Sequence, residues 1–236
     1  MLNKAMILAA GLGTRLKPWT DHHPKALALV NGKPLLQRNI EYLQQFGIYD
    51  VVVNVHHYAQ QIIDAVTHNN GWGSKISFSN ETDAVLETGG GLKRAATYFE
   101  GTDHFVLMNA DILTDLKIDQ MLVQHSENNA LATLAVTERK TSRYLLFNEN
   151  NLLCGWMNDK SGEIKGHLGN KKAFSGIHII QASLLRLITE EGKFSIIDVY
   201  LRLCNNYKIR AYDHSSGLLQ DVGKPESITL AEKLFP

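Results

Sequence analysis

One stretch near the start of the chain decides the fold: Ala5-Met6-Ile7-Leu8-Ala9-Ala10-Gly11-Leu12-Gly13-Thr14-Arg15. Its short apolar run predicts a strand buried on both faces, as in a parallel sheet. The two glycines that follow let backbone N–H groups approach a phosphate or a base edge closely. We therefore expect a phosphate-binding turn after the first strand, with Arg15 placed to meet a polyphosphate by forked hydrogen bonds.

Taken alone, this turn fits several structural interpretations. A dinucleotide-binding fingerprint needs a third glycine where Leu16 stands, and a Walker A loop needs Ser or Thr where Pro34 follows Gly32-Lys33. The chain therefore matches neither motif at the spacing that the motif requires. A tight turn with a solvated arginine remains an alternative for this segment taken by itself.

Short β-branched runs alternate with amphipathic segments over the first part of the chain. Strands are expected at 5–10, 51–55, 76–79, 105–108 and 131–136, and helices at 34–43 and 58–68. This order predicts parallel strands joined by right-handed crossovers. The expected fold class is α/β, a Rossmann-like three-layer α/β/α arrangement with a mixed, mostly parallel sheet.

The regular alternation ends near residue 138. Strands are expected at 143–147, 152–157, 174–180 and 209–212, and helices at 182–190, 195–204 and 225–234. We expect one domain over residues 1–236. Within it, 1–137 would bind the nucleotide, 138–220 the acceptor, and 221–236 would add a closing metal ligand and the last helix.

The overall composition excludes several classes of protein. Lys plus Arg and Asp plus Glu are equal at 24 each, so no global field favours nucleic acid or a membrane surface. The two cysteines form no CxxC motif, and no apolar run approaches the roughly 18 residues that a membrane span needs. The first apolar run is also too short for a signal peptide. We expect a cytoplasmic monomer or small homo-oligomer.

Two aspartates are candidate Mg²⁺ ligands. Asp111 follows the apolar run 105–110 at the carboxyl end of an expected strand, where open α/β sheets bind ligands. Asp221 comes just before the helix that begins at Pro225. Mg²⁺ commonly takes one or two carboxylates together with substrate phosphates. Each aspartate could instead be a helix cap or a turn residue.

Three further features have both a functional and a plain structural interpretation. Lys25 follows the rigid Pro24 and could direct charge at a phosphoryl group, although a loop lysine is often only solvated. Gly89-Gly90-Gly91 is expected to leave free N–H groups at a helix start, packed against a flat base, or else to be a flexible loop. The ten histidines show no ligand spacing and are expected on the surface or in loops.

Taken in order, the motifs resemble the sugar-1-phosphate nucleotidyltransferases. The motifs that carry the resemblance are Leu8 to Leu16, Pro24-Lys25, Leu86-Glu87-Thr88-Gly89-Gly90-Gly91, Asn109-Ala110-Asp111, Phe174-Ser175-Gly176-Ile177 and Asp221-Val222-Gly223. The match is specific up to about residue 115 and at Asp221, and it is loose between about 138 and 172. Relatives that use GTP or dTTP tend to carry Leu-Gly-Thr-Ala where this chain has Leu86 to Gly89. On that segment and on length, the chain is most similar to the N-acetylmuramate α-1-phosphate uridylyltransferases of peptidoglycan recycling.

The resemblance implies a nucleotide-diphospho-sugar transferase fold and an Mg²⁺-dependent enzyme. Such an enzyme joins a nucleoside triphosphate, here UTP, to a sugar-1-phosphate and releases pyrophosphate. The implied catalytic residues are Lys25, Arg15 and Asp111, and the implied metal ligands are Asp111 and Asp221. The implied nucleotide-binding residues are Ala10, Gly11, Leu12, Gly13, Thr14, Arg15, Lys25, Thr88, Gly89 and Asn109. The implied sugar-phosphate-binding residues are Gly176, Glu87 and Lys160.

Two departures from the family pattern concern the acceptor. The Glu-Lys-Pro triplet of many relatives is missing from residues 158–165, which leaves Lys160 and Lys165 as candidates, and Leu145 stands where relatives have glycine after tyrosine. Mannose-1-phosphate guanylyltransferase and glucose-1-phosphate thymidylyl- or uridylyltransferase remain alternatives. Two more distant alternatives are a metal-dependent glycosyltransferase, which would usually carry Asp-x-Asp at residues 109–111, and a non-catalytic nucleotide-binding subunit.

Overall fold

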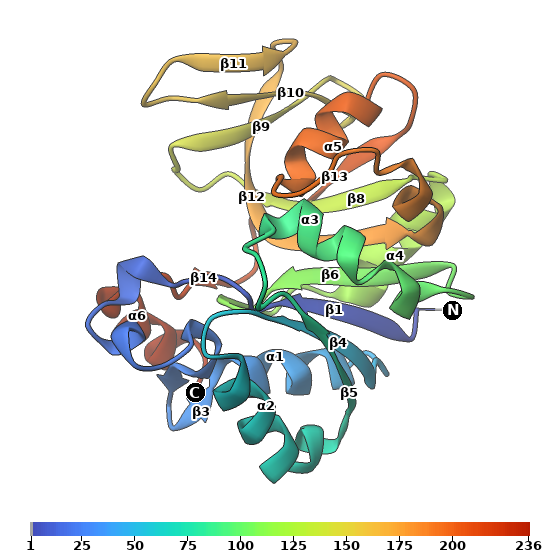
Figure 1. Cartoon of the computed structure of the whole chain (residues 1–236). Helices are drawn as coiled ribbons and strands as arrows, with labels where there is room; N and C mark the ends of the chain where they lie inside the picture. Colours follow the sequence, from blue (N-terminus) through green and yellow to red (C-terminus); the bar gives the residue numbers. More distant parts are fainter. Residues whose placement is uncertain (1) are drawn as a thin grey trace.

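The first apolar run forms the centre of the sheet in a computed structural model that describes residues 2–236 (Figure 1). Strand β1 (Lys4–Leu8) pairs in parallel with β4 (Asp50–Val55) on one side and with β6 (His104–Asn109) on the other. β5 (Lys75–Asn80) extends the parallel part beyond β4. Because β1 is covered on both faces, its middle residues are apolar and fully buried.

Successive side chains of these strands point to opposite faces of the sheet and fill two separate cores. Ile7 belongs to a core shared with α1, α2 and α4, whereas Met6 belongs to a core shared with α3 and α5. Helices therefore cover both faces, as Figure 1 shows. The helices are α1 (Leu35–Gln44), α2 (Ala59–His68), α3 (Glu87–Arg94), α4 (Ile118–Glu127), α5 (Ile196–Leu203) and α6 (Pro225–Leu234).

The second half of the chain adds antiparallel strands, and the long strand β12 (Asn170–Gln181) connects the two halves. β12 pairs with β6 over its last residues, with β9 over its first residues, and with β8 along its other edge. β10 and β11 continue from β9 to the edge of the sheet, while β13 pairs in parallel with β8. These strands are β8 (Ala132–Thr137), β9 (Arg143–Phe147), β10 (Leu153–Asn158), β11 (Glu163–Gly166) and β13 (Ile209–Asp213).

A third, smaller core lies beside the sheet, where the segment between β1 and α1 packs against α6. Leu16, Val30 and Ala231 are buried in it together. In Figure 1 this segment and the C-terminal helix lie side by side. The segment contains the hairpin β2 (Leu29–Val30) and β3 (Lys33–Pro34) and short 3₁₀ helices at Thr14–Leu16, Trp19–Asp21 and Lys25–Leu27. Further 3₁₀ helices are Asn70–Gly73, Ala96–Phe99 and Ala182–Leu187.

The expected α/β fold with a mixed sheet and flanking helices is confirmed, and most expected elements are present within a few residues. Helix α4 was not expected from the pattern. The expected helix at 182–190 is wrong in type and length, because Ala182–Leu187 is a 3₁₀ helix. The division of the chain into nucleotide-binding and acceptor-binding parts stays a prediction.

The expectation of surface histidines is wrong for His125, His178 and His214, which are 0%, 1% and 7% exposed. Each ring has a hydroxyl partner: His125 with Thr133 at 2.9 Å, His178 with Tyr200 at 2.8 Å and His214 with Ser175 at 2.8 Å. Buried polar groups in proteins usually have such partners, although Nδ1 of His214 is buried without one. Over the same described residues, none of the helices has the length and apolar character of a membrane span.

Candidate active site

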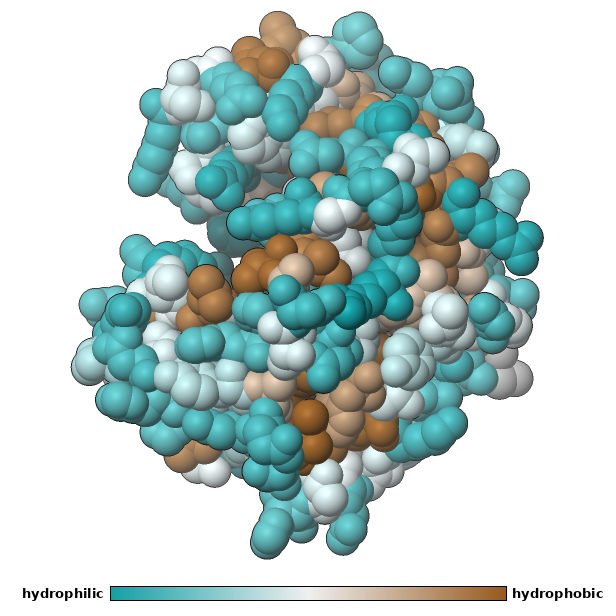
Figure 2. Space-filling model, in the orientation of Figure 1, coloured by the Kyte–Doolittle hydropathy of each residue, from teal (hydrophilic) through white to brown (hydrophobic). Residues whose placement is uncertain are grey.

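A cavity of about 530 Å³ opens at the carboxyl ends of β1, β4 and β6. Figure 2 shows this side of the molecule hollowed between the β9–β11 part and the α6 part. Most of the residues expected to bind a nucleotide line the cavity. Before α1 these are Ala10, Gly11, Gly13, Thr14, Arg15 and Lys25, and from later segments they are Thr88 and Asn109. The expected metal ligand Asp111 lines the cavity as well.

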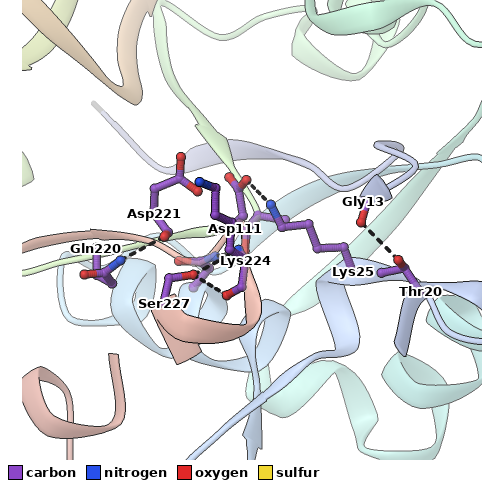
Figure 3. Close-up of polar contacts among 10 residues, drawn as sticks. Gly13, Thr20, Lys25, Asp111, Gln220, Asp221, Lys224 and Ser227 are labelled. Atoms are coloured by element: carbon purple, nitrogen blue, oxygen red, sulfur yellow. Dashed lines mark hydrogen bonds and ion pairs between the residues drawn. The ribbon is translucent and has the colours of Figure 1, made fainter. Parts of the chain in front are cut away.

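The glycine turn is built around Gly13, whose backbone is left-handed with φ of 62°. A Cβ on Gly13 would lie 2.8 Å from the Cβ of Lys25 and 2.9 Å from the Cγ2 of Thr20, so a side chain has no room there. The Thr20 hydroxyl donates to the Gly13 carbonyl at 3.0 Å, which holds the turn closed (Figure 3). A Cβ on Gly11 would meet no atom within 4 Å, so Gly11 leaves open space at the cavity wall.

Asn54, at the end of β4, holds the backbone that precedes this turn. Its Oδ1 accepts the N–H groups of Ala9 at 2.6 Å and Ala10 at 3.3 Å, and its Nδ2 donates to Glu81 at 2.8 Å. Burial raises the pKa of Glu81, while the hydrogen bond from Asn54 and the charge of Arg94 partly offset this rise. This pair was not predicted from the sequence, although Asn54 is the one polar residue in the valine run 51–55.

Asp111 and Asp221 meet because two very short strands pair behind them. β7 (Ile112–Thr114) directly follows Asp111, and β14 (Leu219–Asp221) pairs with it antiparallel, with Asp221 opposite Ile112. The N–H of Val222 donates to the Asp111 carbonyl at 2.8 Å. This local ladder brings together two carboxylates that lie far apart in the sequence.

Two cations, Lys25 and Arg15, lie close to the two aspartates. The ammonium of Lys25 forms an ion pair with Oδ2 of Asp111 (Figure 3). Arg15 packs over Gly223, where a Cβ would lie 2.7 Å from both the guanidinium and Oδ1 of Asp221. Burial and then the neighbouring Asp111 raise the pKa of Asp221, although Lys25 and Arg15 lower it.

The donor set fits a hard divalent cation. Oδ1 of Asp221 is buried and has no hydrogen-bond partner. A buried carboxylate oxygen without a partner is costly, and a cation would satisfy it. Among residues 2–236 no group of three or more His, Cys, Asp or Glu side chains forms a cage. Two carboxylates with open positions for phosphate oxygens and water match the habits of Mg²⁺.

The glycine triplet does not leave a free helix start, so that expectation is wrong. Helix α3 begins at Glu87, and the N–H groups of Gly89 and Gly90 donate to the Phe194 carbonyl at 3.0 and 3.3 Å. A Cβ on Gly89 would lie 2.5 Å from the Phe194 ring. The glycines therefore let α3 pack closely against the segment that leads into α5, and Gly89 is not part of the cavity wall.

The remaining expected residues differ in whether they line the cavity. Glu87 lines it, with a left-handed backbone at φ of 60°. Gly176 packs against the side chain of Asn109, which lines the cavity. Leu12 is 44% exposed and Lys160 lies in the exposed turn between β10 and β11, and neither belongs to the cavity wall. Arg143 lines the cavity from β9 and was not expected.

A family profile described as nucleotidyl transferase matches residues 4–146, which include the glycine turn, Lys25 and Asp111. The chain belongs to the nucleotidyl transferase family. Its resemblance to sugar-1-phosphate nucleotidyltransferases is confirmed by relatives within that family. N-acetylmuramate α-1-phosphate uridylyltransferase of Neisseria meningitidis is 42% identical over 113 residues, 48% of each chain. Mannose-1-phosphate guanyltransferase of Yarrowia lipolytica is 29% identical over 98% of this chain and 64% of its own length.

Solved structures of other proteins share the fold of this chain. HddC of Yersinia pseudotuberculosis, crystallised with GMP-PN, is 26% identical with a TM-score of 0.80 over 100% of both chains. A UDP-glucose pyrophosphorylase at 18% identity and a TM-score of 0.81 has the same fold over 99% of this chain and 98% of its own. The present chain spans only 48% and 64% of the lengths of the two curated relatives named above.

Proposed function

We propose that the protein is an Mg²⁺-dependent nucleotidyltransferase that condenses a nucleoside triphosphate with a sugar-1-phosphate and releases pyrophosphate. The observation that carries this proposal is the group formed by Lys25, Asp111 and the unpartnered buried oxygen of Asp221. Lys25 and Asp111 share one cavity with the open glycine turn, and the main chains of Asp111 and Asp221 are adjacent. The names of the family relatives support the same reaction class.

The chemistry requires charge neutralisation more than proton transfer. A phosphate oxygen of the acceptor attacks the α-phosphorus of the triphosphate, and the bond to the departing pyrophosphate breaks as the new P–O bond forms. The attacking oxygen is already anionic near neutral pH, so no general base is needed. Bringing two anions together is opposed by repulsion, which preorganised positive charge reduces.

Different residues of this chain would supply this charge neutralisation. Lys25 neutralises the reacting phosphates, and Arg15 binds the phosphates that leave. Asp111 and Asp221 would hold Mg²⁺. The cation, when bound, supplies further charge neutralisation and orients the triphosphate. The backbone of Ala10, held by Asn54, would fix the position of the nucleotide.

For substrates we propose UTP and N-acetylmuramate α-1-phosphate, which would give the protein a role in cytoplasmic peptidoglycan recycling. The support is the 42% identity to an enzyme of that name and the Leu86 to Gly91 segment. The second candidate pair is GTP and mannose-1-phosphate. It is favoured by the similarity to a mannose-1-phosphate guanyltransferase over 98% of the chain.

A substrate panel tests both the reaction and the substrates. Five nucleoside triphosphates are crossed with the 1-phosphates of N-acetylmuramate, N-acetylglucosamine, glucose and mannose, with Mg²⁺, and pyrophosphate release is measured. We expect the highest kcat/KM for UTP with N-acetylmuramate α-1-phosphate, and no turnover by Asp111→Asn. A preference for GTP with mannose-1-phosphate would select the second candidate. Nucleotide binding without pyrophosphate release from any pair would contradict the proposed reaction.

A further inference from the structure

The charged side chains that line the cavity differ in whether they have a hydrogen-bond or ion-pair partner. They are Arg15, Lys25, Glu81, Glu87, Asp111 and Arg143. Lys25 pairs with Asp111, Glu81 accepts from Asn54 at 2.8 Å, and Glu87 lies 3.7 Å from Lys193. The guanidinium of Arg15 lies beside Gly223. Across residues 2–236, neither this guanidinium nor that of Arg143 makes a hydrogen bond or ion pair.

Arg143 differs from Arg15 and Lys25 in its position in the chain. It is the first residue of β9, in the second half of the chain, and it is exposed, whereas Arg15 and Lys25 lie in the segment between β1 and β2. In the second half, Lys165 of β11 pairs with Asp198 at 3.2 Å and Lys171 of β12 pairs with Asp159 at 2.9 Å. Within the described chain, Arg143 is therefore the one cation that this half adds to the cavity wall.

The chemistry of the proposed acceptor includes a group that Arg143 could bind. N-acetylmuramate α-1-phosphate carries two separate anionic groups, the phosphate that reacts and the carboxylate of its lactyl ether. The reacting phosphate must lie near Lys25 and the two aspartates. The lactyl ether is on C3, separated by C2 from the carbon that carries the phosphate, so its carboxylate needs a different cation. A guanidinium matches a carboxylate by two parallel N–H···O hydrogen bonds, which a lysine cannot reproduce.

We propose that Arg143 recognises the carboxylate of an anionic acceptor sugar and selects it over sugar phosphates that lack this group. This inference rests on the proposed function and adds the residue that determines acceptor specificity. Arg143 is then a binding residue that acts on KM and takes no part in the transfer step. The occupant of this part of the cavity is a carboxylate-bearing hexose 1-phosphate.

The test compares two acceptors that differ in the lactyl group, N-acetylmuramate α-1-phosphate and N-acetylglucosamine 1-phosphate, each with UTP. Arg143→Gln should lower kcat/KM for the first acceptor about 10- to 100-fold, mainly through KM, because one charged hydrogen-bonded pair is lost. It should change kcat/KM for the second acceptor less than about threefold. Arg143→Lys should fall between wild type and Arg143→Gln on the first acceptor.

The matched control is Arg186→Gln, because Arg186 is also exposed and lies outside this cavity. It should leave both acceptors unchanged. Thermal melting of every variant checks the fold, which should be unaffected because the Arg143 side chain has no partner. Equal losses on both acceptors would overturn the proposal, since Arg143 would then bind the shared phosphate. No loss on either would also overturn it.

Two wild-type results separate the role of Arg143 from the transfer reaction itself. A wild-type enzyme that releases pyrophosphate equally fast with both acceptors would keep the transfer reaction and remove the role of Arg143. A wild-type enzyme that uses only uncharged acceptors such as mannose-1-phosphate would contradict both the proposed acceptor and Arg143. A shift in the ratio of the two kcat/KM values, seen only in Arg143 variants, is the result that supports the inference.

Discussion

The unpartnered oxygen of Asp221 makes the metal-free protein less stable than it could be. Oδ1 is buried without a hydrogen-bond partner, and Asp111 lies close enough to repel it. We expect Asp221→Asn to raise the free energy of unfolding of the metal-free protein by about 1 kcal/mol, since a neutral amide costs less to bury. Urea unfolding in EDTA measures this.

The same variant should lose its response to the cation. Mg²⁺ with a nucleoside triphosphate should raise the melting temperature of the wild type, and raise that of Asp221→Asn much less, because ligands that bind only the folded state stabilise it. Asp64→Asn, at an exposed helix position, serves as the control and should behave like the wild type. A metal-free Asp221→Asn protein that is clearly less stable than wild type would contradict this account.

Lys25 should matter more for turnover than for nucleotide affinity. Its ammonium pairs with Asp111. In the proposed reaction, Lys25→Ala would remove positive charge from the place where negative charge accumulates in the transition state. We expect kcat to fall about 100- to 1,000-fold, as for the loss of other preorganised charge stabilisers. The nucleotide Kd, measured by calorimetry, should change less than about tenfold. A larger effect on Kd than on kcat would make Lys25 a binding residue only.

The sequence predicted the residues of the site that sit in short local motifs, such as Gly13, Lys25 and Asp111. It did not predict Asn54 and Glu81, because their role depends on pairing between β4, β5 and the end of β1. Nor did it predict Arg143, whose position in the cavity follows from how β9 is attached to β12. Contacts of this kind are set by the tertiary fold and leave no local pattern.

At the scale of elements, the glycines of α3 determine how closely it approaches the segment before α5. A Cβ on Gly90 would lie 2.4 Å from the backbone carbonyl oxygen of Gly192, which cannot rotate away as a flexible side chain could. We expect Gly90→Ala to destabilise the fold by about 1–3 kcal/mol, as other overpacking substitutions do. Urea unfolding measures the change.

Gly11→Ala provides the comparison, since a Cβ there meets nothing within 4 Å and the backbone is not left-handed. Its free energy of unfolding should stay within about 0.5 kcal/mol of wild type. Its nucleotide affinity should fall, because the methyl group would occupy open space at the cavity wall. Equal stability of Gly90→Ala and wild type would show that α3 can move away from α5.

Element types followed from the sequence where periodicity was strong, as in α1, α2 and β4. The glycine triplet misled because the same residues suit a free helix start and a close helix contact, and only the position of Phe194 distinguishes them. The apolar spacing of 182–190 predicts an α-helix, but the same spacing also fits the 3₁₀ helix Ala182–Leu187. The buried histidines are invisible to hydropathy, because each depends on a hydroxyl from another element.

At the scale of the whole molecule, buried histidines should make stability fall as pH falls. Burial, and secondarily the charge of His104, lowers the pKa of His125 to about 4 from an ordinary 6.5, and burial lowers that of His178 to about 3. The folded protein keeps these rings neutral while the unfolded chain protonates them. Their stabilisation is therefore full above pH 6.5 and is lost progressively below it, up to about 2 kcal/mol per ring between pH 7 and 5.

The comparison that isolates this effect uses His125→Gln, which keeps a polar group beside Thr133. Urea unfolding at pH 7 and pH 5 should show a smaller loss of stability for His125→Gln than for wild type. His167→Gln, at an exposed position, should lose as much stability as the wild type. Identical pH dependence of His125→Gln and wild type would show that this ring is not held neutral by the fold.

The long strand β12 determines what happens when the chain is cut into two fragments. It completes the sheet beside β6 and β8 and also anchors β9. A chain cut near residue 138 would leave its first fragment with the hydrogen-bonding edges of β6 and β8 open to other molecules. The two fragments would be soluble only as a reassembled complex, so a split reporter made at this point should regain activity solely when both pieces are present together.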